Sequence, residues 1–377
     1  MIGSGPAGVG AAEAFRERRA DVPVRILTAD TDEPYQRPPL SKEFLRGETD
    51  DVSLHPSAWF AERDLDVIKA APVDAIDVQA HTVTAAGRRY EYAHLILASG
   101  ASPTPLPVPG GELALQLRSL QDAGRLRAAA QRAESAVVIG AGFIGCEAAA
   151  SLALKGLSVT LVAPEKLPQD KRLGTAAGEK LVALIEGAGA RFSGGVGVKE
   201  IRAGAVVLDN GGTVTADLIV AATGVQPNSA LAEAAGVPTE QSRIVVDAGM
   251  ATPLPDVYAA GDVALAFNTT AGRAIVIEHW QDAADQGAVA GARAAGADAK
   301  WSSVPGFWTT IGDTTVKYHA WGDGYDDSRL IEHRDGFTVW YESGGATVAV
   351  LTCNADDDYD LGESLIQASK PAPVPVR

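Results

Sequence analysis

The residues of this sequence with the clearest chemical potential are two short glycine motifs. They are Gly3-x-Gly5-x-x-Gly8 and Gly140-x-Gly142-x-x-Gly145. A loop with this spacing, placed between a strand and a helix, lets a pyrophosphate approach the backbone, while the helix N-terminus offers N–H groups and a positive dipole to the phosphates. The chemistry that the motifs predict is the binding of two dinucleotides.

The elements around the second motif are those that such a site needs. An apolar run, 136–139, predicts a buried strand before the glycines, a helix of small residues is expected at 146–155, and a second strand follows at 158–162. The glycine spacing alone is a weak signal, but this order of strand, loop, helix and strand makes it specific.

The first motif lacks part of this setting. Only Met1 and Ile2 precede Gly3, whereas a central strand usually has about five residues. We therefore expect the native first strand to begin before Met1. The second strand of this unit is predicted at 24–28.

The two halves of the chain repeat one plan. Ala98-Ser-Gly100 and Ala222-Thr-Gly224 end equivalent apolar strands, and the proline-rich stretch 103–109 predicts a boundary between the halves. After the second half the chain returns through a strand that ends on Asp262, where open α/β sheets bind ligands. Alternating strands from 305 to 353 predict a different domain at the C-terminus.

Composition excludes several classes of partner. The chain of 377 residues is 46% hydrophobic with a net charge of −16, so neither nucleic acid nor an anionic membrane surface is an expected partner. No membrane span is expected, because the least polar long stretch, 135–154, contains Glu147 and the motif glycines. No signal peptide is visible, and Cys146 and Cys353 are too few for a disulfide framework, which favours the cytoplasm. A monomer and a homodimer both stay open.

Two further segments are similar to a known family. They are RPPLSK at 37–42 and TPLPDVYAAGD at 252–262. In the first, the prolines enforce an extended turn, and Ser41 is expected to cap the next helix. Together with the glycine motifs they resemble the FAD-dependent pyridine nucleotide oxidoreductases, in the branch of the ferredoxin reductases and apoptosis-inducing factor.

The resemblance implies an α/β fold with two Rossmann-like dinucleotide-binding domains and a C-terminal α+β domain. FAD is then expected on residues 1–107 and 227–300, NAD(P)H on 108–226, and the C-terminal domain 301–377 over the flavin.

The resemblance also implies roles for single residues. Gly3, Gly5, Gly8 and Arg37 would hold the FAD pyrophosphate, and Asp262 the ribityl chain. Lys42 would lie near flavin N5 and pair with Glu147, the two being the expected catalytic residues. Phe143 would shield the nicotinamide pocket, and the flavin ring would be lined by His279, Trp280 and Trp308. The other expected cofactor-binding residues are Pro6, Ala7, Ser99, Gly100, Gly140, Gly142, Ile144, Gly145, Gly224 and Gly261. No metal site is expected.

The chain departs from the family pattern at three places. Ala29 stands where an acidic residue would bind the FAD ribose, and Asp30 is expected to replace it. Ala163 stands at the equivalent place for the nicotinamide coenzyme, with Glu165 close behind, which favours NADH and leaves NADPH as an alternative. Residues 30–60 contain no cysteine, so the redox thiols of the disulfide reductases and peroxidases are missing, and Cys146 is expected to be a packing residue.

Three functions therefore remain open after the flavin has been reduced. The first passes electrons from NADH through FAD to a ferredoxin-type iron–sulfur protein or another small redox protein. The second is an NADH-sensing flavoprotein, similar to apoptosis-inducing factor, whose redox state controls a partner interaction. The third is a thiol-free NADH oxidase or quinone reductase.

Overall fold

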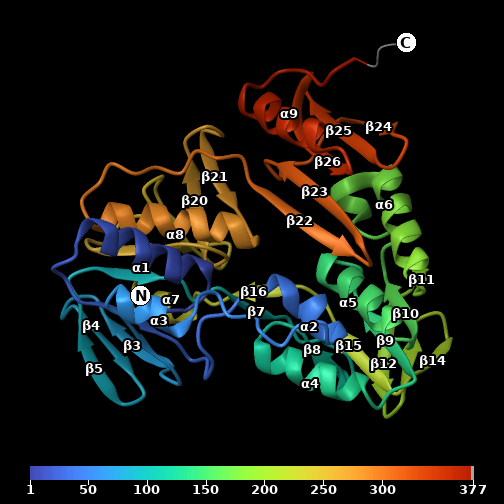
Figure 1. The fold of residues 1–377 in the computed structure, drawn as a ribbon, viewed down its shortest axis with the longest axis horizontal. Helices are drawn as coiled ribbons and strands as arrows, with labels where there is room; N and C mark the ends of the chain where they lie inside the picture. The colour runs from blue at the N-terminus through green and yellow to red at the C-terminus, as the bar shows by residue number, and fades with distance from the viewer. Residues whose placement is uncertain (375–377) are drawn as a thin grey trace. The chain divides into compact units, whose positions relative to one another are not determined.

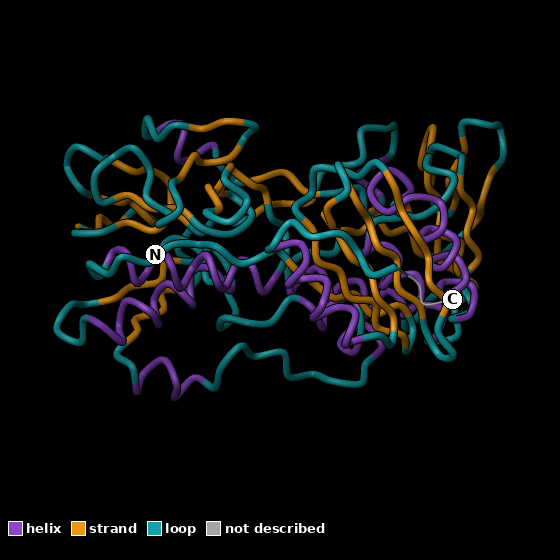
Figure 2. Tube along the Cα trace, turned by 90° about the horizontal axis from the view of Figure 1, so that it is seen from above, coloured by secondary structure: helices purple, strands orange, loops and turns teal. Residues whose placement is uncertain are grey.

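The computed structural model describes residues 1–374, which form two compact units. The first unit comprises residues 1–36, 53–102 and 226–307, and the second comprises 37–52, 103–225 and the described residues from 308 onward. Both units contain helices and strands (Figure 2), as in an α/β protein. The end of the expected C-terminal domain, 375–377, lies outside the described residues.

Parallel strands carry the first glycine motif. β1 (Val24–Leu27) pairs with β2 (Leu65–Ile68), and β6 (Leu95–Leu97) pairs with β19 (Val257–Ala259). Ile2 forms parallel bridges to Leu27 and Leu97, so it lies between β1 and β6, where the first strand was expected. Ahead of it, the ammonium group of Met1 donates to the carbonyl oxygen of Arg25.

Two helices of the first unit, α1 (Pro6–Arg18) and α8 (Trp280–Ala294), pack closely against each other (Figure 1). A Cβ atom on Gly287 would lie 2.1 Å from the carbonyl oxygen of Ala7, and one on Gly291 would lie 2.0 Å from that of Ala11. Only glycine permits this approach. The first turns of α1, which contain Gly8 of the glycine motif, are therefore fixed against α8.

The first unit has further helices and sheets. They are α3 (Ser57–Glu62), α7 (Ala230–Ala234), a sheet of β3 (Val73–Asp77), β4 (Thr82–Ala85) and β5 (Arg88–Glu91), and a sheet of β17 (Thr239–Glu240), β18 (Arg243–Val246), β20 (Ala264–Asn268) and β21 (Arg273–Val276). β7 (Ala101–Pro103) and β16 (Val225–Pro227) pair as a separate sheet.

The second unit contains a parallel sheet in the order β11-β10-β9-β15-β8. Its strands are β8 (Leu115–Gln116), β9 (Ser135–Ile139), β10 (Ser158–Ala163), β11 (Arg191–Gly194) and β15 (Leu218–Ala221). The central strand β9 is buried from Ala136 to Ile139, and Gly140 of the second motif follows it directly. The helices of this part are α4 (Leu120–Ala130), α5 (Phe143–Leu154) and α6 (Asp170–Gly187).

Smaller elements and a further sheet complete the second unit. They are η1 (Pro38–Ser41), α2 (Glu43–Arg46), η2 (Gly111–Leu113), and a sheet of β12 (Val198–Arg202), β13 (Ala205–Leu208) and β14 (Thr213–Thr215). The C-terminal sheet has the order β22-β23-β26-β25-β24. It consists of β22 (Gly306–Ile311), β23 (Thr314–Ala320), β24 (Asp327–Glu332), β25 (Phe337–Ser343) and β26 (Ala346–Cys353), and α9 (Asp356–Gln367) packs on it.

The boundaries predicted from the sequence differ from these by a few residues. Helix α5 begins at Phe143, three residues before the predicted start, so Phe143 and Glu147 lie on one helix. Helix α6 begins at Asp170 and is kinked at Gly174, whose φ of +76° suits glycine. Within residues 1–374, no helix is both long and apolar enough to cross a membrane.

Candidate functional site

The two glycine turns have the same local geometry in their separate units. The first glycine of each motif has a positive φ, +107° at Gly3 and +103° at Gly140. A Cβ atom would lie 2.1 Å from the carbonyl oxygen of Ala98 in the first case and 2.4 Å from that of Ala222 in the second. Since Ala98 and Ala222 end the repeated strands, the repeat seen in the sequence is also a repeat of backbone contacts.

The helix that follows each turn begins without a side-chain cap. Gly5 is the N-cap of α1 and Gly142 that of α5, and no side chain among the described residues caps either helix. The N–H groups of a first helical turn need acceptors, and a pyrophosphate supplies them together with the charge that the helix dipole favours. Both turns therefore fit the phosphates of a dinucleotide.

Asp262 and Gly261 lie beside the first of these turns. Asp262 is buried, and a Cβ atom on Gly261 would lie 3.1 Å from the Cβ atom of Ala7 in α1. Three expected cofactor-binding residues from distant parts of the sequence thus lie together in one unit.

In the second unit, the structure brings Lys42 and Glu147 together. The Lys42 Nζ atom lies 3.2 Å from both carboxylate oxygens of Glu147, and each of the two side chains is only 7% exposed. A lone charge so deeply buried would be strongly destabilising, and the pair removes most of that penalty. The ion pair expected from the resemblance is therefore present, with its members 105 residues apart in sequence.

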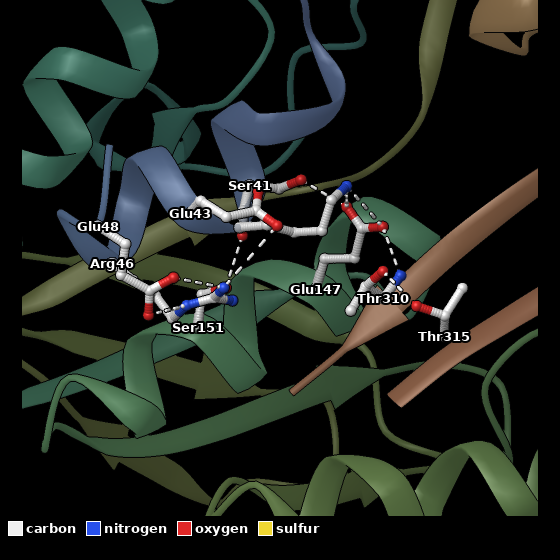
Figure 3. A network of polar contacts seen from close by, with 9 residues as sticks. Ser41, Glu43, Arg46, Glu48, Glu147, Ser151, Thr310 and Thr315 are labelled. Carbon is white, nitrogen blue, oxygen red and sulfur yellow. Dashed lines mark hydrogen bonds and ion pairs between the residues drawn. The ribbon is translucent and has the colours of Figure 1, made fainter. Parts of the chain in front are cut away.

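Glu147 has further donors from two other segments (Figure 3). The Ser41 hydroxyl donates to Oε2, the Thr309 hydroxyl donates to Oε1 at 2.7 Å, and the Thr310 N–H donates to Oε1 at 3.2 Å. One carboxylate of α5 thereby holds η1 on one side and β22 on the other. Each of these contacts supplies a donor to the carboxylate, which compensates for its removal from water.

The expectation for Ser41 was wrong. Helix α2 has Lys42 as its N-cap and no side-chain cap, and the Ser41 hydroxyl is directed to Glu147 instead. The carbonyl oxygen of Ser41 accepts from the Ser151 hydroxyl at 2.7 Å, and Ser151 lies one turn beyond Glu147 on α5. The RPPLSK segment is thus anchored on the helix that carries the second glycine motif.

Several residues of the first unit that were expected to bind FAD make hydrogen bonds or ring contacts with other residues of the protein. Asp30 accepts from the Tyr35 hydroxyl at 2.7 Å, and the hydroxyl of Ser99 donates to the carbonyl oxygen of Asn228. His279 lies 3.0 Å from the Asp282 carboxylate, and its ring contacts Phe307 with 4.3 Å between centroids. Trp280 is the first residue of α8, and Gly100 has the positive φ of a tight turn.

The other expected residues of the second unit come from several segments, namely α5, the loop after β10, β22, the start of η1 and the loop after β15. Phe143 is in cation–π contact with Arg172, the guanidinium carbon lying 6.0 Å from the ring centroid. Ile144 and Trp308 are apolar yet 38% and 45% exposed. The carbonyl oxygen of Glu165 accepts from Gly195, its side chain being half-buried. Arg37 is the N-cap of η1, and Gly224 lies in the loop between β15 and β16.

The cysteines take no part in these sites. Within residues 1–374 both are buried and free of disulfide bonds. Burial raises the pKa of the Cys146 thiol far above its usual range, which agrees with a packing role. The described residues also contain no group of side chains suited to a metal ion.

Sequence reasoning missed Ser41, Thr309 and Thr310 as partners of Glu147. The sequence indicated only that Glu147 needs hydrogen-bond donors, because a carboxylate in the first turns of a buried helix requires them. Which residues supply them depends on the pairing of distant segments and could not be read from the local pattern.

Comparisons with known proteins agree with this architecture. The sequence profile described as pyridine nucleotide-disulphide oxidoreductase matches residues 1–287. The chain is 34% identical over 98% of its length, and 93% of the relative's, to the ferredoxin–NAD(+) reductase component of the anthranilate 1,2-dioxygenase system of Burkholderia cepacia. It is 32% identical over 94% of its length to human apoptosis-inducing factor 3, of which it spans 60%.

The fold is likewise shared with a solved structure. The ferredoxin reductase for the CYP199A2 system of Rhodopseudomonas palustris superposes with a TM-score of 0.93 at 31% identity, covering 98% of this chain and 95% of that one. Taken with the duplicated glycine turns, these matches show that the chain belongs to the pyridine nucleotide-disulphide oxidoreductase family and groups with its ferredoxin reductases and apoptosis-inducing factor 3.

Proposed function

We propose that this chain is an FAD-dependent NADH reductase whose electron acceptor is a ferredoxin-type iron–sulfur protein. The family and the ferredoxin–NAD(+) reductase relatives imply FAD and NAD(H) as its cofactors. Bound FAD supplies a ring that takes a hydride from NADH and gives up electrons singly. The residues of the chain must bind both cofactors, exclude water and set the electrostatics.

The observation that carries the proposal is the Lys42–Glu147 pair. A protein that only binds dinucleotides has no need to bury a lysine and a carboxylate in mutual contact, because such a pair contributes little to stability compared with apolar packing. A fixed cation of this kind can instead stabilise negative charge that develops on a reduced flavin. We therefore assign Lys42 to the flavin and Glu147 to holding its ammonium group.

The remaining assignments follow the two units. FAD would bind on residues 1–107 and 227–300, through the first glycine motif, Arg37 and Asp262. NAD(P)H would bind on 108–226, through the second motif and Glu165, and residues from 301 onward would cover the flavin. The matching geometry of Gly3 and Gly140 supports a dinucleotide in each place.

Cofactor content is the first test. The purified protein should be yellow, with one FAD per chain, or should become so when apoprotein is mixed with FAD. A colourless protein that cannot be reconstituted would refute the assignment.

A second function is favoured by the similarity to human apoptosis-inducing factor 3. In that alternative, NADH reduces the flavin into a long-lived complex, and the changed shape of the protein recruits a partner. A thiol-free oxidase or quinone reductase is the third. Stopped-flow reduction with NADH, followed in separate experiments by air, by a quinone and by an oxidised ferredoxin as the electron acceptor, separates the three. Fast reoxidation by ferredoxin supports a reductase, fast reoxidation by air or quinone supports the oxidase, and persistence against all of them supports the sensing protein.

A further inference from the structure

Gln286 of α8 is fully buried and uses only one half of its side-chain amide. Its Oε1 atom accepts the N–H of Gly261 at 2.9 Å. That bond fixes which amide atom is oxygen and which is nitrogen. Its Nε2 atom is buried as well and has no hydrogen-bond partner among the described residues.

The amide lies where three segments of the first unit meet. Gly261 precedes Asp262, and its Cβ position is 3.1 Å from the Cβ atom of Ala7 and 3.4 Å from that of Ala283. The neighbouring Gly287 touches the backbone of Ala7. Gln286 of α8 therefore lies beside the turn at Gly261–Asp262 and near the first turn of α1, which contains Gly8 of the glycine motif.

A buried amide N–H without an acceptor is strongly disfavoured, and nearly all such groups in native proteins are paired. The Oε1 atom already has its donor in the N–H of Gly261, and Nε2 is itself a donor that no acceptor among the described residues satisfies. The missing group should therefore be an oxygen acceptor, of the kind found in a pyrophosphate or in ribityl hydroxyls.

We propose that Gln286 is an FAD-binding residue, which donates its Nε2 hydrogen to an oxygen of bound FAD while its Oε1 atom holds the turn at Gly261–Asp262. The inference rests on FAD as the cofactor, but not on the identity of the electron acceptor. A buried water molecule unrelated to FAD is the competing partner for Nε2. FAD affinity and thermal unfolding of variants distinguish the two partners.

The test is the substitution Gln286→Glu, measured as the affinity of apoprotein for FAD in a fluorescence titration. The glutamate keeps the shape and the acceptor for Gly261, but at high pH it replaces the donor by a negative charge. At about pH 8.5 we expect FAD affinity to fall by about tenfold or more, because an ionised carboxylate would face an oxygen of the cofactor. At about pH 5.5 a protonated carboxyl again has a hydrogen to donate, so most of the loss should disappear.

Gln281→Glu is the matched control, because Gln281 is exposed on the same helix. Expressing each affinity relative to this variant at the same pH removes the general effect of acid on FAD binding. Gln286→Met, which has neither donor nor acceptor at any pH, should bind FAD weakly throughout, without recovery in acid. If Gln286→Glu fails to fold, Gln286→Met provides the affinity measurement in its place.

Thermal unfolding with and without FAD separates the two occupants. If Nε2 contacts FAD, FAD raises the Tm of Gln286→Glu less at about pH 8.5 than at about pH 5.5, relative to Gln281→Glu, in addition to any loss of apoprotein stability that a buried carboxylate causes at high pH. If the partner is a structural water, the apoprotein loses stability and folded variants bind FAD as the wild type does, which would overturn the proposal. None of these measurements uses ferredoxin, so failure of the proposed acceptor leaves the result unaffected.

Discussion

Thr309 of β22 donates its hydroxyl to Glu147 of α5 at 2.7 Å, although 162 residues separate them in the sequence. The same carboxylate accepts from Lys42, which follows the proline-rich turn. Three segments of one unit therefore converge on a single buried charge. The first two predictions concern how strongly those segments depend on it.

Lys42→Ala and Glu147→Ala should each slow the reduction of the flavin by NADH, by about tenfold or more, because a preorganised charge is lost. Each should also lower the free energy of unfolding by about 3–5 kcal/mol, since the remaining partner is left buried and uncompensated. The double variant should lose less than the sum, because the two side chains act as a unit. Single-turnover reduction rates and denaturant unfolding of the four proteins, with FAD content checked in each, measure both effects.

A matched control is the exposed pair of Lys180 and Glu332, whose charged atoms lie 2.6 Å apart. Its two alanine variants should change stability by about 1 kcal/mol or less. If the losses at Lys42 and Glu147 simply add, or if Lys42→Ala reduces at the wild-type rate, the pair does not act on the flavin.

Thr309→Val removes one donor from Glu147 while keeping the shape of a side chain that is 1% exposed. We expect a loss of about 1–3 kcal/mol in the free energy of unfolding, because a buried carboxylate oxygen loses its hydroxyl partner. Thr310→Val is the control, since Thr310 donates to Glu147 through its backbone N–H and directs its hydroxyl to Thr315. Equal losses for the two variants would mean that the hydroxyl of Thr309 is unimportant.

The helices and strands around Glu147, and its contact with Lys42, could be predicted from the sequence. The hydroxyl and N–H groups that donate to Glu147 could not. Strong local patterns, such as the apolar run before Gly140, determined the strands and helices to within a few residues. The pairing of Lys42 with Glu147 came from the resemblance to the family, and the cost of burying either charge alone agrees with it. Thr309 looked like any threonine in a strand, and Ser41 looked like a helix cap, since the acceptor of a hydroxyl depends on tertiary register. Gln286 showed no signal at all, because a polar residue on a helix is ordinary until the helix is known to be buried there.

NADH should be preferred over NADPH, with a kcat/KM ratio of about tenfold, equivalent to about 1.4 kcal/mol. The physical reason is Glu165, just after β10, whose carboxylate can accept from a ribose 2′-hydroxyl and repels a 2′-phosphate. Glu165→Gln should reduce the preference, whereas Glu186→Gln, on the exposed side of α6, should leave it unchanged. Lys166, Lys171 and Arg172 act in the opposite direction, so a tenfold preference for NADPH would show that these cations dominate.

Asp217 should make the second unit sensitive to acid. Its carboxylate accepts the backbone N–H groups of Glu134 and Ser135 and the Ser135 hydroxyl, all at 2.9–3.0 Å, and so connects the segments that lead into β9 and β15. These donors hold the pKa of Asp217 below its usual value, the backbone bond from Glu134 contributing most. A carboxyl with a depressed pKa in the folded state stabilises the fold above its unfolded pKa of about 3.9, and this stabilisation disappears as the pH falls through the folded-state pKa. Asp217→Asn should therefore lower the Tm at neutral pH, and the difference from the wild type should narrow below about pH 4. Thermal unfolding across that range, with Glu186→Gln as the surface control, measures the difference; a gap that stays constant down to acid pH would show that the ionised form contributes nothing.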